Sequence, residues 1–378
     1  MPLIDDEGNL FGVVNVIDAL AVVLLLAVIV AGITFVGVLG SDSGGESEPE
    51  TRYATVDLGG QPDYVVDRVS EGDTVTVNGS SNGHTITDVY VTPVNTENGG
   101  SQAQITVRVA VNGKAVEVEE RDDPIFQFAG KHPRAGDSLT VETGDYTASG
   151  HLTSLESEGE SLSTDKTPIL LESTLSESTV DELDEGDTVT LGPHTTATIT
   201  NVQLYPASGD QYRALIGAEL STLQQGSMPA YGGQTVTVGS QISLSPGSYD
   251  LTGDVVRRGT DQEVGEPTTT GAQIELENVH PEVADEFQAG MTETVRGETL
   301  VTVQSVETEP AAVVLESEDG NIYQREHPRN KDITLSVELQ TQRTDTGLRF
   351  HGQSLQAGNN VTLDFGTTTV EGSVAQLE

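Results

Sequence analysis

Residues 19–39 read ALAVVLLLAVIVAGITFVGVL and carry no charged side chain, Thr34 being the only polar one. A hydrocarbon core about 30 Å thick is crossed by about 20 helical residues at ~1.5 Å each. The run therefore predicts one membrane-spanning helix, with the lipid bilayer as its partner. A cleaved signal peptide is the alternative, but the run is too long, no positive region precedes it and no A-x-A-like site follows it. We expect the helix to be retained.

The charge of the chain sets its surroundings and excludes several partners. The chain has 60 acidic and 17 basic residues, a formal net charge of −43 at pH 7 and no cysteine. Salt at 1 M shortens the Debye length to roughly 3 Å and removes the self-repulsion of such a surface, which predicts a halophilic source. Phosphate recognition needs clustered Lys and Arg, so nucleic acid is excluded as a partner. The lack of cysteine excludes disulfides, thiolate metal sites and a cysteine nucleophile.

The orientation of the membrane helix is not set by its flanks. The first basic residue is Arg52, so neither side has the Lys and Arg excess that the positive-inside rule counts. Large domains translocate regardless of loop charge. Two N-x-S/T sequons, at Asn78 and Asn360, are the expected glycan acceptors of an outside domain. We therefore expect a single-pass cell-membrane protein with its C-terminal body extracellular.

Beyond a stretch rich in Ser, Gly and Glu, apolar and polar residues alternate with period two. Thr74–Val77, Gln104–Val111 and Thr334–Leu339 are examples, and Asn112-Gly113 is one of the turn signals that separate such segments. This pattern is typical of half-buried strands, and helical periodicity is rare. The body is predicted to be all-β.

Two sequence blocks recur three times in the same order. The first predicts a short helical turn with apolar residues three apart, ended by a glycine and followed by a strand. Its glycines lie 114 and 104 residues apart, at Gly72, Gly186 and Gly290. The second block runs through an alternating segment, and its first glycines lie 103 and 119 residues apart, at Gly136, Gly239 and Gly358. Three β repeats of about 100 residues follow.

The predicted fold class is mainly β, with one N-terminal transmembrane helix followed by three repeated small β-barrel or β-sandwich domains. A repeat of this length can build its own core, unlike the thin units of a solenoid. Polar, turn-rich seams separate the repeats. The expected divisions are a juxtamembrane head (1–18), the transmembrane helix (19–39), a linker (40–51), β domain 1 (52–155), a linker (156–167), β domain 2 (168–258), a linker (259–270) and β domain 3 (271–378).

The head of the chain carries a family resemblance. Leu3–Asp18 follows the pattern L-I-D-x-x-G-x-L-F-G-x-x-N-x-x-D directly before the apolar run. This resembles the uncharacterised membrane-anchored prokaryotic family filed as domain of unknown function 4330, here as a haloarchaeal member, and best over residues 1–155. The resemblance implies a membrane anchor with an outside β domain and supplies no reaction. Independently, Asp5–Asn9 is a turn between the apolar pairs Leu3-Ile4 and Leu10-Phe11, which predicts a small hairpin.

Two serine motifs imitate hydrolase signatures. Gly136-Asp137-Ser138-Leu139 spells one, but its serine lies in an alternating strand and the equivalent positions of the other repeats have no serine in register. Gly79–Gly83 matches G-x-S-x-G, yet a nucleophile elbow needs a helix after the serine and Thr85–Val91 continues as a strand. The second motif is predicted to be a hairpin loop.

Metal and sugar chemistry are disfavoured as well. The seven histidines form no HxxxH or HxH pair, and Asp181–Asp187 lacks the spacing of an EF-hand loop, so that segment is interpreted as a solvated acidic face. Paired carboxylates for glycoside hydrolysis stay open, although a chain with no Trp has few platforms for sugars. We expect no catalytic, cofactor-binding or metal-binding residues and no cofactor.

The favoured function is a membrane-tethered, non-enzymatic cell-envelope protein whose repeated β body scaffolds or binds other envelope or membrane proteins. The alternative is an accessory subunit of a membrane transport or polysaccharide-export complex. A hydrolase ranks third, because it would need one repeat to carry an acid pair that its sister repeats lack.

Overall fold

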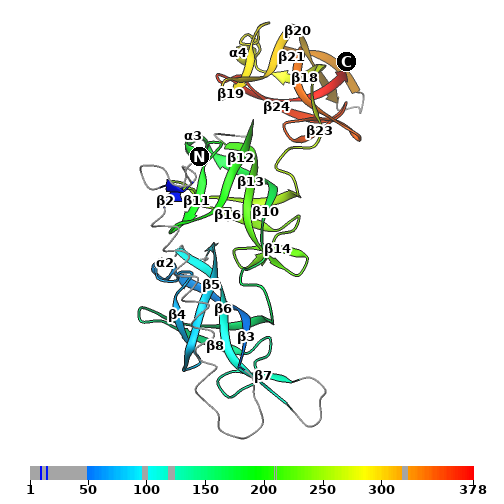
Figure 1. Cartoon of the computed structure of the whole chain (residues 1–378). Helices are drawn as coiled ribbons and strands as arrows, with labels where there is room; N and C mark the ends of the chain where they lie inside the picture. Colours follow the sequence, from blue (N-terminus) through cyan, green and yellow to red (C-terminus); the bar gives the residue numbers. More distant parts are fainter. Residues whose placement is uncertain are drawn as a thin grey trace, which may run out of the picture. The chain divides into compact units, whose positions relative to one another are not determined.

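A computed structural model describes residues 9–10, 14–15, 49–95, 101–117, 124–207, 209, 211–316 and 322–378. The protein is mainly β, and three curled sheets follow one another along the chain (Figure 1). The predicted membrane helix, residues 19–39, lies outside the described residues. Within the described part of the chain, no helix has both the length and the apolar character needed to cross a bilayer.

A two-stranded hairpin lies in the head. It pairs β1 (Asn9–Leu10) with β2 (Val14–Asn15), Asn9 facing Asn15. The turn that the sequence predicted at Asp5–Asn9 lies outside the described residues except for Asn9, which is paired in β1.

The first repeat is a seven-stranded sheet with one short helix. Its strands run in the order β3-β9-β8-β4-β5-β6-β7, and β3 also pairs with β6, so the path returns to its start. Its elements are β3 (Pro49–Pro62), α2 (Asp63–Val66), β4 (Thr74–Val77), β5 (Ser80–Asn95), β6 (Ser101–Val116), β7 (Ile125–Gln127), β8 (Ser138–Glu142) and β9 (Thr147–Glu156).

The second repeat is an eight-stranded sheet. Its main path is β11-β12-β13-β10-β17-β16, and β14 and β15 form a hairpin on β13. Its elements are β10 (Thr164–Ser176), α3 (Glu177–Glu182), β11 (Thr188–Leu191), β12 (His194–Pro206), β13 (Gln211–Gln225), β14 (Met228–Tyr231), β15 (Gln234–Thr235), β16 (Gln241–Leu244) and β17 (Leu251–Arg258).

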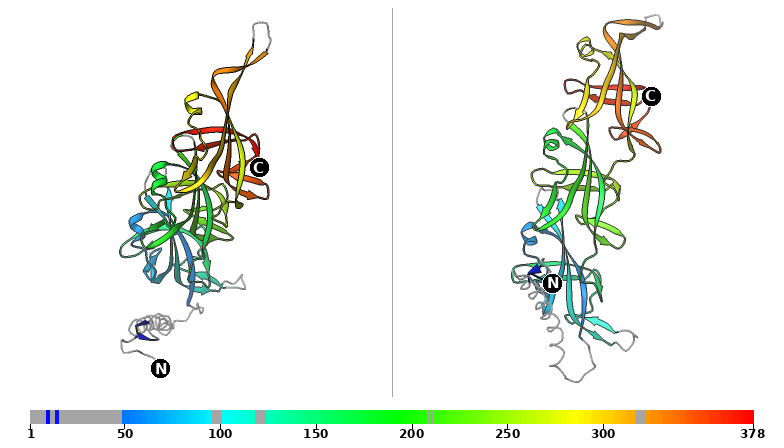
Figure 2. Two further views of the ribbon diagram at one scale, coloured as in Figure 1. Left: turned by 90° about the horizontal axis from the view of Figure 1, so that it is seen from above. Right: turned by 45° about the horizontal axis from the view of Figure 1, so that its top comes forward.

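The third repeat has the same plan, with the path β19-β20-β21-β18-β25-β24 and the hairpin β22–β23 on β21. Figure 2 shows β20 and β21 continuing beyond the sheet as an arm, where Ala312–Glu316 pairs only with Ile322–Glu326. Its elements are β18 (Glu266–Val279), α4 (Pro281–Ala284), β19 (Thr292–Val295), β20 (Glu298–Glu316), β21 (Ile322–Thr344), β22 (Gly347–Phe350), β23 (Gln353–Leu355), β24 (Asn360–Asp364) and β25 (Thr369–Leu377).

The three sheets repeat one strand order, which agrees with the three β repeats that the sequence blocks predicted. Read from the strand after the helix, the first repeat is β4-β5-β6-β3-β9-β8, which matches the main paths of the other two. Each predicted helical turn is present, as α2, α3 and α4. The predicted linkers 156–167 and 259–270 run into strands, because β10 begins at Thr164 and β18 at Glu266.

The repeat glycines hold the same backbone contacts in each sheet. The first-block glycines donate N–H to the partner strand, Gly72 to Ile86 at 2.8 Å and Gly186 to Ile199 at 2.8 Å. All six lie at φ between +87° and +95°. Residues with a Cβ rarely adopt this conformation, which explains why glycine recurs there.

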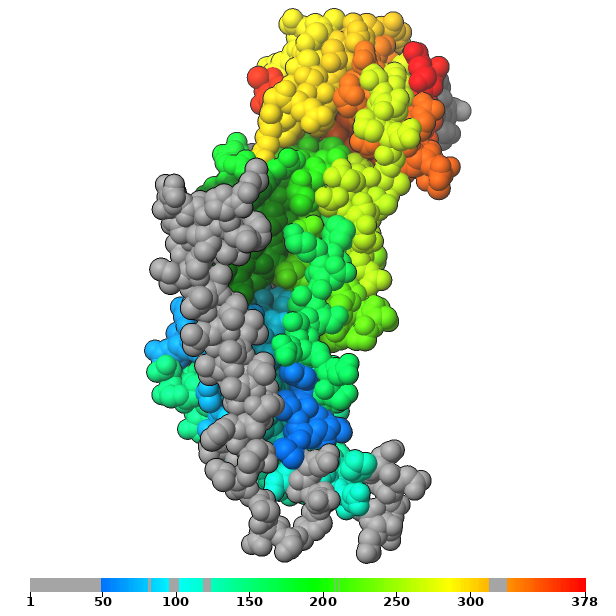
Figure 3. All heavy atoms as spheres, in the orientation of Figure 1, coloured from blue at the N-terminus to red at the C-terminus, as the bar shows by residue number. Residues whose placement is uncertain are grey.

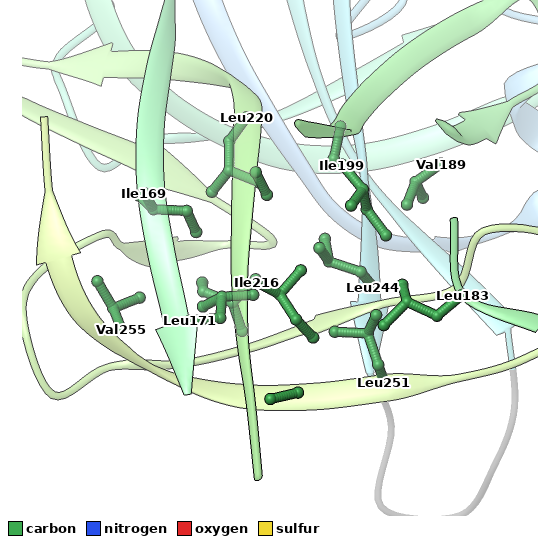
Figure 4. Close-up of a cluster of buried hydrophobic side chains, with 14 of the residues drawn as sticks. Ile169, Leu171, Leu183, Val189, Ile199, Ile216, Leu220, Leu244, Leu251 and Val255 are labelled. Carbon is green, nitrogen blue, oxygen red and sulfur yellow. The ribbon is translucent and has the colours of Figure 1, made fainter. Parts of the chain in front are cut away.

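Each repeat buries its own core. In the second repeat, Ile169, Leu171, Ile216 and Leu220 are fully buried, and Figure 4 shows them packed with Leu244 between the curled strands. The third repeat has a separate cluster, and the first buries side chains such as Ile86 and Phe126. The chain nevertheless forms two compact units: among the described residues, one holds 71–88 and 108–160 with β3 up to Asp57, and the other holds 58–70, 89–107 and 161–378.

Candidate functional site: the joints between repeats

Chemically active side chains gather where one repeat meets the next. Within the described ranges, no three His, Asp or Glu residues lie in a metal-binding arrangement. A polar cluster instead joins the second and third repeats, both in the second compact unit, where green and yellow atoms meet in Figure 3. We call this contact the second joint.

The second joint is built around His351, at the tip of the β22–β23 hairpin. Its ring lies 5.2 Å from that of Tyr205 on β12, centroid to centroid. The His351 carbonyl accepts a hydrogen bond from Arg213 Nη1 at 3.1 Å, and a Cβ on the next residue, Gly352, would lie 3.3 Å from Leu215 Cδ1. The hairpin tip is therefore packed directly on the second sheet.

Two close contacts between basic and acidic side chains surround this tip. His351 Nε2 lies 2.7 Å from Glu293 Oε1, and Glu293 is only 1% exposed. Arg349 Nε lies 3.5 Å from Glu263 Oε1. Among the described residues, none of these four atoms has a partner with hydrogen-bond geometry. Arg349 and Glu263 form an ion pair, whereas the His351–Glu293 contact is an ion pair only when the imidazole is protonated.

Tyr205 links the hairpin to the segment between the repeats. Its hydroxyl donates to Glu263 Oε2 at 2.9 Å. Burial and the neighbouring Glu263 carboxylate raise the pKa of Tyr205, because both disfavour a phenolate. The phenol therefore stays a hydrogen-bond donor.

A second turn of the third repeat docks on the end of α3. Arg296, in the β19–β20 turn, donates through Nη2 to the carbonyl oxygens of Val180 and Leu183. These carbonyls close the C-terminal end of α3, where a cation also complements the helix dipole. Arg296 Nη1 lies 3.8 Å from Asp184 Oδ1.

The first joint connects the second repeat to the part of the first repeat that belongs to the same compact unit. Tyr90, on β5, donates to the carbonyl oxygens of Ser221 at 2.8 Å and Ala230 at 3.1 Å. The fully buried Thr92 accepts from Gly232 N at 3.1 Å. Burial raises the pKa of Tyr90, so it too stays protonated and donates.

The two joints use equivalent parts. Gly232 and His351 occupy the same position of equivalent hairpins, and both have positive φ. The β19–β20 turn meets the end of α3, and the equivalent Gly192 turn lies against Val66 of α2. On the other side, Pro93 lies near the end of β5 and Pro206 ends the equivalent strand β12. One interface is therefore built twice.

A cleft beside the hairpin accompanies this interface. In the second repeat the cleft has a volume of about 280 Å³ and is bordered by Pro93 and Val94 of the first repeat. In the first repeat the equivalent cleft has a volume of about 290 Å³, and its lining consists of Asn78, Phe128, Ala129, Lys131, Pro133, Asp137, Ser138 and Leu139. Among the residues that the structure describes, none from another repeat borders the cleft of the first repeat.

In the G-x-S-x-G motif, Ser80 occupies the first variable position rather than the serine position, and its Oγ lies 3.3 Å from Nε2 of the buried His84. Ser138 begins β8 and borders the cleft of the first repeat, whose lining contains no histidine. Asp137, next to it, accepts from Arg134 N at 2.8 Å in a local turn. The predicted hairpin loop Gly79–Gly83 is wrong in extent, because Val77 pairs with Ser80 and only Asn78-Gly79 forms the turn.

Both predicted glycan acceptors are exposed. Asn78 holds its turn in place, its Oδ1 accepting from Thr140 N at 2.9 Å. Asn360 opens β24, and its Nδ2, the atom a glycan would occupy, donates to Glu371 Oε1 at 2.9 Å. Glycosylation at either position stays a prediction.

The fold is a series of three β repeats. The first joint and the second joint have the same design. The chain matches the family described as Domain of unknown function (DUF4330) over residues 1–156 and 259–378, and it belongs to that family. The matched segments contain the first and third repeats, and the second repeat lies between them. No curated protein and no solved structure matches the chain.

Sequence reasoning missed the hairpins that make the joints. A signal was present: an aromatic residue, a variable one and a glycine recur six residues before the second-block glycine, at Phe128–Gly130, Tyr231–Gly233 and Phe350–Gly352. The prolines on the facing strands of the two joints, Pro93 and Pro206, also recur in the third repeat, as Pro310.

Proposed function

We propose that this chain is a membrane-tethered, non-enzymatic protein of the cell envelope whose repeated β body, outside the membrane, scaffolds or binds other envelope components. The observation that carries this proposal is the use of its polar side chains. Tyr90, Tyr205, Arg213, Arg296 and His351 all bind other parts of the chain and hold repeats together.

The alternative role, an accessory subunit of a membrane transport or polysaccharide-export complex, shares the tether and differs in its partners. A simple tether extracted in mild detergent at the salt concentration of growth emerges without other membrane proteins. Stoichiometric co-purification of a membrane complex would favour the accessory role.

Protease treatment of intact cells in their growth salt tests the location of the body. An epitope is placed after Glu378, and a cytoplasmic protein serves as the control. We expect the epitope to disappear while the control survives. Full protection in intact cells, with cleavage after lysis, would place the body inside and overturn the proposal.

A further inference from the structure

Each repeat presents two distinct faces to its neighbours. The head face consists of the aromatic-x-Gly hairpin and the turn after the helix-proximal strand, as at Gly232 and Gly192 in the second repeat. The tail face consists of the end of the short helix and the proline-bearing strand end, as at Val180 and Pro206. Both joints place the head of one repeat on the tail of the repeat before it.

One head face and one tail face are uncovered among the described residues. The head face of the first repeat has its hairpin at Ala129, its turn at Asn78 and the open cleft between hairpin and β8. The tail face of the third repeat has α4 and Pro310, and from Pro310 the strand β20 continues to Glu316 as part of the arm. Burial reflects this difference, because Pro206 is buried in the second joint whereas Pro310 and Ala129 are exposed.

The two uncovered faces have opposite charge at their centres. Lys131, one of four lysines in the chain, stands beside Ala129 at the hairpin tip and is exposed. Glu309 precedes Pro310 at the position that Tyr205 holds in the second repeat, and it is exposed as well. In the described part of the chain, neither side chain is in an ion pair with another residue. Opposite charges across an interface steer association and fix its register.

We propose that the head face of the first repeat binds the tail face of the third repeat in a second copy of this chain. The copies then associate head to tail through a joint of the same design as the two inside each chain. Such a heterologous interface does not pair with itself, so it extends into open chains of copies unless a rotation closes a ring. The inference stands on the joints alone and holds wherever the body is located.

The joint between copies is weaker than those within one chain. Asp332 replaces Arg213 on the tail face, and its carboxylate already accepts from Asn278 N at 2.7 Å and Ala312 N at 3.1 Å. The aromatic contact of Tyr205 is lost with Glu309. The contact therefore depends on the proline, the cleft and the Lys131–Glu309 charge pair, and it is reversible on dilution.

The first experiment measures the mass of the full chain in mild detergent at 1 M salt by sedimentation over a hundredfold range of concentration. We expect dimers and longer species that grow with concentration. Because 1 M salt screens exposed charges, Lys131→Glu should weaken association by only about two- to fivefold, and adding Glu309→Lys to it should restore most of the affinity. Each variant is compared with the parent by its thermal unfolding midpoint.

Cysteine pairing gives an independent readout, because the natural chain has no cysteine. Chains with Ala129→Cys are mixed with chains with Glu309→Cys and oxidised, and we expect a covalent heterodimer. In the control, chains with Asp250→Cys are mixed with the Glu309→Cys chains in place of the Ala129→Cys chains. Asp250 is exposed and lies on neither face. A monomer at every concentration, a charge swap without rescue, or cross-linking no better than the control would each overturn the proposal.

Discussion

His84 is fully buried in the first repeat, and its hydrogen bonds require a neutral ring. Its Nδ1 accepts from Asn112 N at 3.1 Å, and its ring meets Phe128 edge-on at 5.2 Å. Burial lowers the pKa of His84, because the charged imidazolium would lose its hydration. In the unfolded chain the His84 imidazole has an ordinary pKa of about 6.5. Below that pH the unfolded chain therefore binds a proton at His84 that the folded chain does not bind.

The stabilisation from neutral His84 is fully present above pH 6.5 and is lost as the pH falls below it. The loss is at most about 2 kcal/mol at pH 5, because the unfolded pKa sets the limit. Denaturant titrations of the parent and of His84→Asn between pH 7.5 and 5 measure it, since the Asn amide oxygen keeps an acceptor near the Nδ1 position. We expect the variant to lose this part of the pH dependence.

His151, which is exposed, provides the matched control. His151→Asn should follow the parent, because carboxylate protonation is common to all three proteins and cancels in the comparison. An equal pH slope in the parent and in His84→Asn would contradict the assignment.

Single residues also explain where sequence reasoning stopped. Residues 156–167 are polar and were predicted to be a linker, but Arg108 donates to the Gly159 carbonyl at 2.9 Å and pairs with Glu156 at 2.5 Å. Arg108 is 3% exposed although it lies in an alternating strand. The composition of residues 156–167 shows only that the segment is polar. It cannot show that the buried Arg108 guanidinium, from a strand about 50 residues earlier in the chain, holds the segment in place.

At the scale of elements, glycine spacing carried most of the predictable information. The recurring glycines located three helix–strand units and three closing strand pairs, because each glycine occupies a backbone conformation that other residues resist. The joints were not predictable by the same means. Tyr205 and His351 come from different repeats and differ from their equivalents, Thr92 and Gly232. The aromatic-x-Gly hairpins and the prolines around the contact recur, but the two residues that touch do not.

Gly253 closes the second repeat where β17 passes close to β10. A Cβ there would lie 2.9 Å from the Glu172 carbonyl oxygen and 3.2 Å from Leu171 Cβ, both parts of a packed strand. Gly253→Ala should therefore lower the free energy of unfolding by about 1–3 kcal/mol, as overpacking does. Denaturant unfolding, followed by circular dichroism, measures the change.

Gly144 is the matched control, since a Cβ there meets nothing within 4 Å and its φ is compatible with other residues. Gly144→Ala should be neutral or stabilising by up to about 1 kcal/mol, because alanine restricts the unfolded chain. If both variants behave alike, close approach is not the reason that the closing block keeps its glycine.

At the scale of the whole molecule, the net charge of −43 decides the conditions under which the fold is stable. The Debye length falls from about 10 Å at 0.1 M salt to about 3 Å at 1 M. Most carboxylates are exposed, so their mutual repulsion destabilises the compact state at low salt. The cores and joints contribute apolar burial and hydrogen bonds that screening leaves nearly unchanged.

The thermal unfolding midpoint should therefore rise by about 10 °C or more between 0.1 and 1 M KCl, equivalent to several kcal/mol for a chain of this size. Scanning calorimetry at constant pH measures it. The variant Glu177→Gln/Asp181→Asn removes two exposed charges from the acidic α3 region and should show a shallower rise. If screening of charge is the cause, KCl and sodium sulfate should raise the thermal unfolding midpoint equally at the same ionic strength below 1 M. A flat midpoint, or a rise with sulfate alone, would mean that salt acts through apolar burial, and the acidic surface would then need an explanation other than adaptation to salt.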